Sequence, residues 1–184
     1  MDNSPEVFEL DELYWFIERK AVTARKRRSE APFSRSENRE RTKTRENVYL
    51  MTMVSRKPRQ IVGFDVALDK SSARIQEIVD SAYDAEKYCT DGYSGYINVV
   101  YPGEHIQNIH NKKDTYTVEG VNADLRHYIP LLARRSRCFA RKLETLQAVV
   151  AVFVDAYNRF GIAKHIYRQK HPIGEIPFAV VDFL

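Results

Sequence analysis

The chain is 184 residues long, carries a formal net charge of +4 and is 43% hydrophobic, which is enough for one domain with a substantial core. No apolar run reaches the roughly 18–20 residues that a membrane span needs, and the acidic N-terminal stretch 1–10 lacks the apolar region of a secretory signal. We therefore expect a cytoplasmic protein with neither a membrane span nor a secretory signal. Cys89 and Cys138 form no C-x-x-C pair, which argues against a disulfide framework or a cysteine-rich zinc site.

The positive charge is concentrated in two stretches of the chain. Between Arg19 and Arg45 there are eleven basic and three acidic residues, and between Arg126 and Lys142 there are six basic residues and no acid. The first stretch carries +8 against +4 for the whole chain, so the remainder carries −4. Such segregation suits a protein that meets a polyanion through its basic surfaces and uses acids elsewhere. A solvated loop and a charged helix face would give the same pattern.

The first half of the chain predicts three strands. Residues 8–17 (FELDELYWFI) are rich in β-formers and have apolar side chains on both faces, which predicts a central strand buried on both sides. Residues 19–46 are basic, rich in Ser, Arg and Glu, and without periodicity, which indicates a long flexible insertion. Residues 47–55 and 60–68 predict two further strands, and the short polar turn between them favours an antiparallel hairpin.

The second half alternates helical and extended patterns. The predicted order is a helix at 72–82, a strand at 87–90, a short helix or loop at 93–100, a strand at 105–109, a helix from 117 to a break at Pro130, and a last helix at 141–160. Three meandering strands followed by alternating helices and strands predict an α/β fold with a mixed sheet and a C-terminal helical extension. The order of elements also resembles a ribonuclease-H-like core.

Three carboxylates come from three separate predicted elements. Asp11 lies within the strand predicted to be central, where an ionised carboxylate needs a partner or a metal. Asp91 directly follows a strand, and Glu119 opens a helix. If the three converge, they supply the oxygen ligands that Mg²⁺ prefers, and two such ions about 3.5–4 Å apart stabilise the attacking and leaving oxygens in phosphoryl transfer.

Each acid also has an ordinary structural role open to it. Asp11 could pair with an arginine, Asp91 could shape a turn, and Glu119 could stabilise the positive end of a helix. Glu12 or Glu9 could replace Asp11 as a ligand.

Three segments resemble a known family of enzymes. FELDELYWFI, YCTDGYSGY and the long run YTVEGVNADLRHYIPLLARRSRCFARKLETLQAVVAVFVDAYNRFG are similar to the catalytic region of insertion-sequence-1 family transposases. The similarity extends from about residue 7 to about residue 161 and is most specific from Thr117 to Asn158. It implies a bacterial DDE transposase with a ribonuclease-H-like fold, which acts on double-stranded DNA at element ends and target with two Mg²⁺ (or Mn²⁺) ions, as a homo-oligomer.

The resemblance also implies which residues form the site. The first catalytic Asp corresponds to Asp11, the second to Asp91 in Thr-Asp-Gly, and the third acid to Glu119 in Val-Glu-Gly-Val-Asn. Asn122 matches a position near the third acid, and its spacing of three residues would place both on one helix face. The implied organisation is a catalytic domain at 1–161, with the basic insertion at 19–46, and a tail at 162–184.

The sequence departs from the family pattern in two respects. Family members normally carry an N-terminal zinc finger and helix-turn-helix that bind the element's ends, whereas this sequence begins almost at the first catalytic strand. Because the catalytic part is often encoded in a second reading frame in that family, the resemblance implies an N-terminal DNA-binding partner or a fused frame. The basic insertion is also bulkier than expected at this hairpin.

Basic residues near the third acid are expected to bind phosphates that flank the scissile one. They are Arg126, Arg134, Arg135, Arg137 and Arg141, with Lys112 and Lys113 ahead of the helix. An exposed face paired with the acidic body is the alternative interpretation. The predicted function is a DNA transposase that cleaves and joins strands. A non-catalytic DNA-binding or regulatory fragment and a ribonuclease-H-like nuclease are the alternatives.

Overall fold

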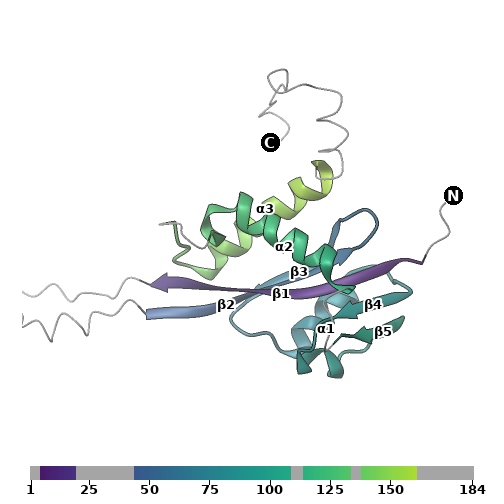
Figure 1. The fold of residues 1–184 in the computed structure, drawn as a ribbon. Helices are drawn as coiled ribbons and strands as arrows, with labels where there is room; N and C mark the ends of the chain where they lie inside the picture. Colours follow the sequence, from purple (N-terminus) through teal and green to yellow (C-terminus); the bar gives the residue numbers. More distant parts are fainter. Residues whose placement is uncertain (1–4, 20–43, 109–113, 134–137, 161–184) are drawn as a thin grey trace, which may run out of the picture.

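A mixed five-stranded sheet forms the centre of the molecule (Figure 1). The computed structural model describes residues 5–19, 44–108, 114–133 and 138–160. β1 pairs antiparallel with β2 and parallel with β4, β2 pairs antiparallel with β3, and β4 pairs parallel with β5. The order is β3-β2-β1-β4-β5, so the predicted α/β mixed sheet and the central position of β1 are confirmed. The strands are β1 (Val7–Arg19), β2 (Thr44–Ser55), β3 (Ile61–Ala67), β4 (Lys87–Thr90) and β5 (Glu104–Gln107).

Helices cover both faces of this sheet. Figure 1 shows α2 and α3 on one face and α1 on the other. The three helices are α1 (Ser72–Ser81), α2 (Tyr116–Tyr128) and α3 (Leu143–Phe160), and the short 3-10 helices are η2 (Ser94–Asn98) and η4 (Pro130–Leu132). α2 ends just before Pro130, as predicted, because proline has no N–H to continue the hydrogen-bond ladder. Within the described ranges, no helix is long and apolar enough to cross a membrane.

β1 contributes to two separate cores, one on each face of the sheet. Because side chains alternate along a strand, its odd-numbered and even-numbered residues face opposite helices. Leu13, Trp15 and Ile17 belong to the cluster that includes residues of α2 and α3. Phe8 and Leu10 belong to the cluster that includes residues of α1. The same alternation directs Glu9 and Asp11 toward α2, and Glu12 to the opposite face of the strand.

The predicted hairpin joins β2 to β3 through a tight polar turn. The turn is closed by a 2.9 Å hydrogen bond from Ser55 N to Gln60 O, and Arg59 has a positive φ of 54°. Further along β3, Gly63 lets α1 approach the sheet closely. A Cβ there would lie 2.7 Å from Cγ2 of Ile78, which is too close for real atoms to tolerate without movement.

Two strands are longer than the sequence predicts. β1 continues to Arg19 and β2 begins at Thr44, and these two end residues pair with each other. Residues 44–46 of the predicted insertion are therefore part of β2. Polar residues take an extended conformation here because the partner strand supplies their backbone hydrogen bonds, which local composition does not reveal. The remainder of the insertion, 20–43, and the predicted tail, 162–184, lie outside the described residues.

Candidate metal centre

The end of β4 leaves an open space beside the central strand. β4 pairs with β1 only from Val7↔Lys87 to Leu10↔Thr90. Beyond Leu10, the described chain provides β1 with no strand partner on this side, while its pairing with β2 continues. Ligands in α/β proteins commonly bind outside the carboxyl ends of parallel strands, and such an end is present here. The next residues on the two strands are Asp11 on β1 and Asp91 after β4.

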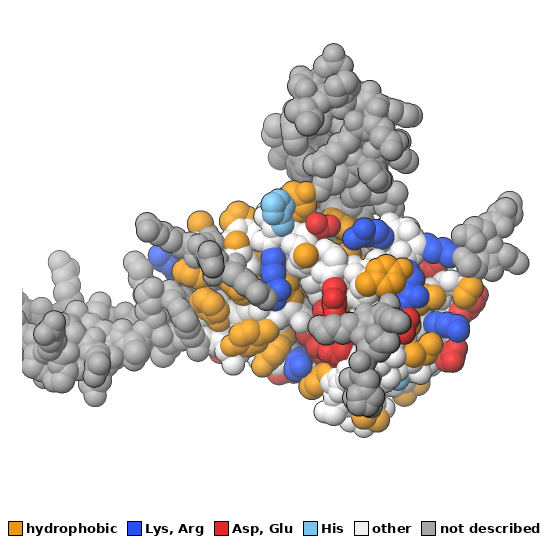
Figure 2. All heavy atoms as spheres, in the orientation of Figure 1, with side chains coloured by type: hydrophobic (Ala, Val, Ile, Leu, Met, Phe, Trp, Pro, Cys, Tyr) orange, Lys and Arg blue, Asp and Glu red, His pale blue; other side chains and the backbone are white. Residues whose placement is uncertain are grey.

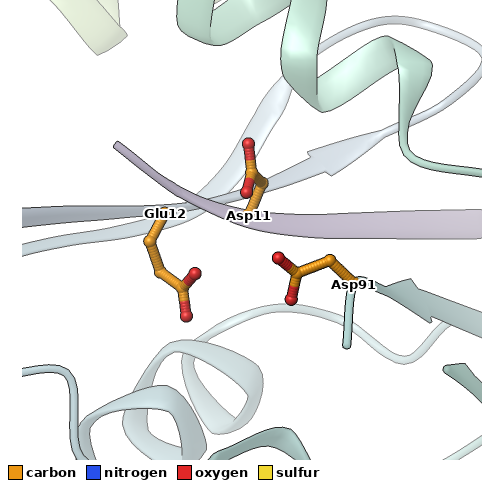
Figure 3. A group of neighbouring side chains, drawn as sticks. All are labelled: Asp11, Glu12 and Asp91. Carbon is orange, nitrogen blue, oxygen red and sulfur yellow. The ribbon is translucent and has the colours of Figure 1, made fainter. Parts of the chain in front are cut away.

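Three carboxylates meet at this point. One oxygen each of Asp11, Glu12 and Asp91 lies within 4.8 Å of the other two. Figure 3 shows the side chains of Asp11 and Glu12 leaving β1 on opposite sides, with the carboxylate of Asp91 on the Glu12 side of the strand and pointing back toward these two residues. Asp91 is held in a turn, since its Oδ1 accepts a 2.9 Å hydrogen bond from the backbone N–H of Tyr93. The site thus joins adjacent residues of one strand to the residue that follows its parallel neighbour.

Two polar side chains, linked by hydrogen bonds, orient Asp11. Its Oδ2 accepts a 2.9 Å hydrogen bond from Nδ2 of Asn122 on α2. Oδ1 of Asn122 in turn accepts a 3.0 Å hydrogen bond from the hydroxyl of Thr52, the residue opposite Asp11 on β2. Asn122 and Thr52 are both buried, so neither side chain is free to move. The amide group therefore fixes the direction of the Asp11 carboxylate.

Burial raises the pKa of Asp11 above its ordinary value. The hydrogen bond from Asn122 opposes this rise by stabilising the ionised carboxylate, whereas the nearby charges of Asp91 and Glu119 add to it. Two like charges close together disfavour ionisation of both, and a bound cation would relieve this repulsion.

Glu12 is the most perturbed acid of the cluster. Its side chain is 7% exposed, and Nζ of Lys70 lies 3.8 Å from its Oε2. Burial raises the pKa of Glu12 from 4.5 to about 7. The charges of Asp91 and Asp11 add to this rise, whereas Lys70 and the hydroxyl of Tyr96 oppose it by stabilising the ionised carboxylate. Its other oxygen, Oε1, is buried and has no hydrogen-bond partner among the described residues. A buried carboxylate oxygen without a donor is an unusual and costly arrangement.

A cavity of about 390 Å³ adjoins the three acids. Glu119, Asn122 and Arg126 of α2 line its wall together with Asp11, Glu12 and Asp91. Figure 2 shows acidic side chains gathered on this face with Lys and Arg side chains around them. The cavity therefore combines oxygen ligands suited to a hard cation with an arginine suited to a phosphate.

No protein-family model matches the chain, and no curated protein matches its sequence. The family resemblance remains a prediction.

The predicted site residues are partly assembled by the fold. Asp11 and Asp91 lie in the cluster, and Glu119 lines the same cavity but is not among the three residues with oxygens within 4.8 Å of one another. Asn122, predicted to support the site, donates a hydrogen bond to Asp11. Arg126 lines the cavity, whereas Arg141 is exposed just before α3. The other five predicted DNA-binding residues lie outside the described residues: Lys112, Lys113, Arg134, Arg135 and Arg137.

The structure gives Glu12 and Glu9 roles other than the sequence suggests. The sequence offers Glu12 as a replacement for Asp11, whereas the structure places it beside Asp11 in the cluster. The sequence also offers Glu9 as a replacement ligand, whereas its two oxygens accept hydrogen bonds from Arg56 and from the start of α2. The signal for Glu12 was the pair of adjacent acids at the point where the parallel neighbour stops. Thr52 and Lys70 carried no signal, because their role depends on tertiary contacts.

Proposed function

We propose that this chain is the catalytic domain of a DNA transposase, with a ribonuclease-H-like fold of the insertion-sequence-1 type. It would cleave DNA and join a 3′ hydroxyl to target DNA with the help of divalent cations. The observation that carries the proposal is the convergence of Asp11, Glu12 and Asp91 at the end of β4. The order of the sheet supports it, since three antiparallel strands are followed by two parallel ones and the first acid lies on the central strand.

The donor set fits Mg²⁺ or Mn²⁺. Hard divalent cations take oxygen ligands, and the cluster offers only carboxylates. The partnerless Oε1 of Glu12 is a buried acceptor that a cation would satisfy. Glu119 adds a fourth carboxylate to the same cavity, which gives enough donors for two ions. Bound there, the ions would activate a water or hydroxyl nucleophile and stabilise the leaving oxygen.

The protein's own groups would orient the ligands and the DNA. Asn122 and Thr52 hold the Asp11 carboxylate in one direction and favour its ionised form. Arg126 lines the cavity, where its guanidinium can contact a backbone phosphate beside the reacting one. The positive charge of the arginine would also favour approach of a polyanion to a site that is otherwise acidic.

The proposal is tested by nicking and joining assays with the purified chain. The substrates are supercoiled plasmid and a labelled duplex with free 3′ hydroxyls, incubated with Mg²⁺ or Mn²⁺. Replacing Asp91 by asparagine should lower the rates of nicking and joining at least about a hundredfold, because one ligand is lost from the shared site. The control is Asp84→Asn, which makes the same chemical change at an exposed aspartate outside the cluster and should leave both activities unchanged.

Three outcomes would contradict the proposal in different ways. Full joining by the Asp91→Asn variant would mean that the cluster is not the active site. Metal-dependent nicking without any joined product would indicate a hydrolytic nuclease. Salt-dependent DNA binding without cleavage would indicate a DNA-binding or regulatory fragment.

A further inference from the structure

A second buried carboxylate lies two residues before Asp11 and is occupied entirely by protein contacts. Glu9 is 0% exposed, and its side chain leaves β1 on the face covered by α2. Its Oε2 accepts hydrogen bonds from the backbone N–H groups of Thr117 at 2.7 Å and Val118 at 2.9 Å. A central strand therefore contacts the first turn of the helix that carries Glu119 and Asn122.

This contact satisfies groups that the helix cannot satisfy itself. The first N–H groups of an α-helix have no intrahelical acceptor. Thr115, at the N-cap of α2, makes no side-chain capping hydrogen bond. Glu9 supplies the acceptor from another element and places a negative charge at the positive end of the helix dipole. The cap is thus also a tether between β1 and α2.

Arg56 balances the buried charge and extends the tether. Its Nε donates a 2.6 Å hydrogen bond to Oε1 of Glu9, and its Nη2 donates a 2.9 Å hydrogen bond to the backbone oxygen of Asp114. The guanidinium also lies 5.4 Å from the ring centre of Tyr116, the first residue of α2. The planar fork of arginine makes these contacts together, which a lysine could not do. Glu9 and Arg56 therefore bind both the start of α2 and the residue ahead of it.

We propose that Glu9, braced by Arg56, is a positioning residue that sets the distance between the β1 acids and the α2 side chains of the site. Asp11 is the second residue after Glu9 on the strand, and Glu119 is the second residue after Thr117 on the helix. Glu119 is outside the tight cluster, so its reach to a shared cation depends on where the first turn of α2 lies. This inference rests on the proposed metal-dependent function, but the tether itself can be measured without DNA or metal.

The test replaces Glu9 by glutamine, which preserves the volume of the side chain and removes its charge. The first readout is amide hydrogen exchange of the metal-free protein, followed by NMR. Exchange of the Thr117 and Val118 amides should become about tenfold faster or more, since loss of the charged acceptor weakens two hydrogen bonds, while the β1–β2 amides should not change. The second readout is the dissociation constant for Mn²⁺, which should rise about tenfold. The third is the rate of strand joining, which should fall while the affinity for DNA is unchanged.

A matched control separates positioning from simple loss of stability. Asn158 makes two 2.9 Å hydrogen bonds with the backbone of Ile61 and fastens α3 to β3, away from the cavity. Asn158→Ala should lower the melting temperature without affecting Mn²⁺ affinity or joining, measured well below both melting temperatures. Arg56→Lys is a milder second variant, for use if the Glu9 variant does not fold, and should shift exchange and Mn²⁺ affinity in the same direction.

If amide exchange at Thr117 and Val118 is the same in the Glu9→Gln variant as in the wild type, Glu9 does not hold the start of α2. Faster exchange with unchanged Mn²⁺ affinity would overturn the positioning role, as would an equal loss of affinity in the Asn158 variant. A wild-type chain that binds Mn²⁺ but joins no DNA would reject the proposed function and leave the positioning inference standing. A wild-type chain that binds no Mn²⁺ would overturn both.

Discussion

Replacing Glu12 by glutamine should stabilise the metal-free protein at alkaline pH and leave its stability nearly unchanged at acid pH. Glutamine has the shape of the protonated acid, so the variant imitates the form that the folded protein prefers. The side chain is 7% exposed, and burial raises its pKa to about 7. Above that pH the wild-type protein must hold an ionised carboxylate in a largely buried place beside two other acids.

The size of the effect follows from proton linkage. Between the ordinary pKa of 4.5 and the folded pKa of about 7, the folded state binds more protons than the unfolded state. The free energy of unfolding therefore falls as the pH rises through this window. A shift of this size corresponds to about 3 kcal/mol at roughly 1.4 kcal/mol per pH unit. The difference between variant and wild type should be close to zero near pH 4.5 and complete above pH 7.

The assay is urea or thermal denaturation in EDTA between pH 4.5 and 8.5. At pH 8, the Glu12→Gln variant should melt roughly 6–12 °C above the wild type, from about 2–4 °C per kcal/mol for a chain of this size. Glu77→Gln, the same change at an exposed glutamate of α1, should give no pH-dependent gain. Equal stability of wild type and Glu12→Gln at pH 8, or an equal gain at both ends of the range, would refute the reasoning.

Metal binding, DNA binding and the packing of α1 on the sheet can each be tested separately. Mn²⁺ at about a hundred times its dissociation constant should stabilise the wild type by about 2.7 kcal/mol in thermal melts, and the Asp91→Asn variant should lose most of this gain. Arg126→Ala should weaken DNA binding and reduce the slope of log affinity against log salt by about 1, measured by fluorescence anisotropy; an unchanged slope would place Arg126 away from the DNA. Gly63→Ala should lower the free energy of unfolding in urea denaturation by about 1–3 kcal/mol, because its Cβ would lie 2.7 Å from Ile78. An unchanged free energy of unfolding would show that α1 can move away from the sheet without cost.

The sheet could be predicted because its strands carry local patterns. The apolar side chains on both faces of residues 8–17 indicated a strand covered on both sides, and the structure confirms two cores there. The polar turn at residues 56–59 likewise indicated the hairpin. The extra length of β1 and β2 was not predictable, because Thr44 and Arg19 are extended only through pairing with each other. Local composition records propensity, whereas strand ends depend on a partner distant in sequence.

Part of the site could be predicted, because residues at the ends of neighbouring parallel strands lie close together. An acid on the central strand and an acid directly after its parallel neighbour must lie near each other, which brought Asp11 and Asp91 together. The contribution of Glu9 was not predictable, because a cap that comes from another element leaves no fixed spacing in the sequence. In a helix that caps itself, a Ser, Thr, Asp or Asn at the N-cap provides that spacing. Here the acceptor lies 108 residues before Thr117.

The early end of β4 explains both the geometry and the energetic cost of the site. Adjacent residues of a strand point to opposite faces, and Asp11 and Glu12 leave β1 on opposite sides. Because β4 ends at Thr90, no paired strand fills the space beside these two residues, and one oxygen each of Asp11, Glu12 and Asp91 lies within 4.8 Å of the other two. The raised pKa values of Asp11 and Glu12 reflect the cost of placing acids in that space. The same space would accommodate the proposed cations, so the cost of burying these acids and the proposed chemistry would have one structural origin.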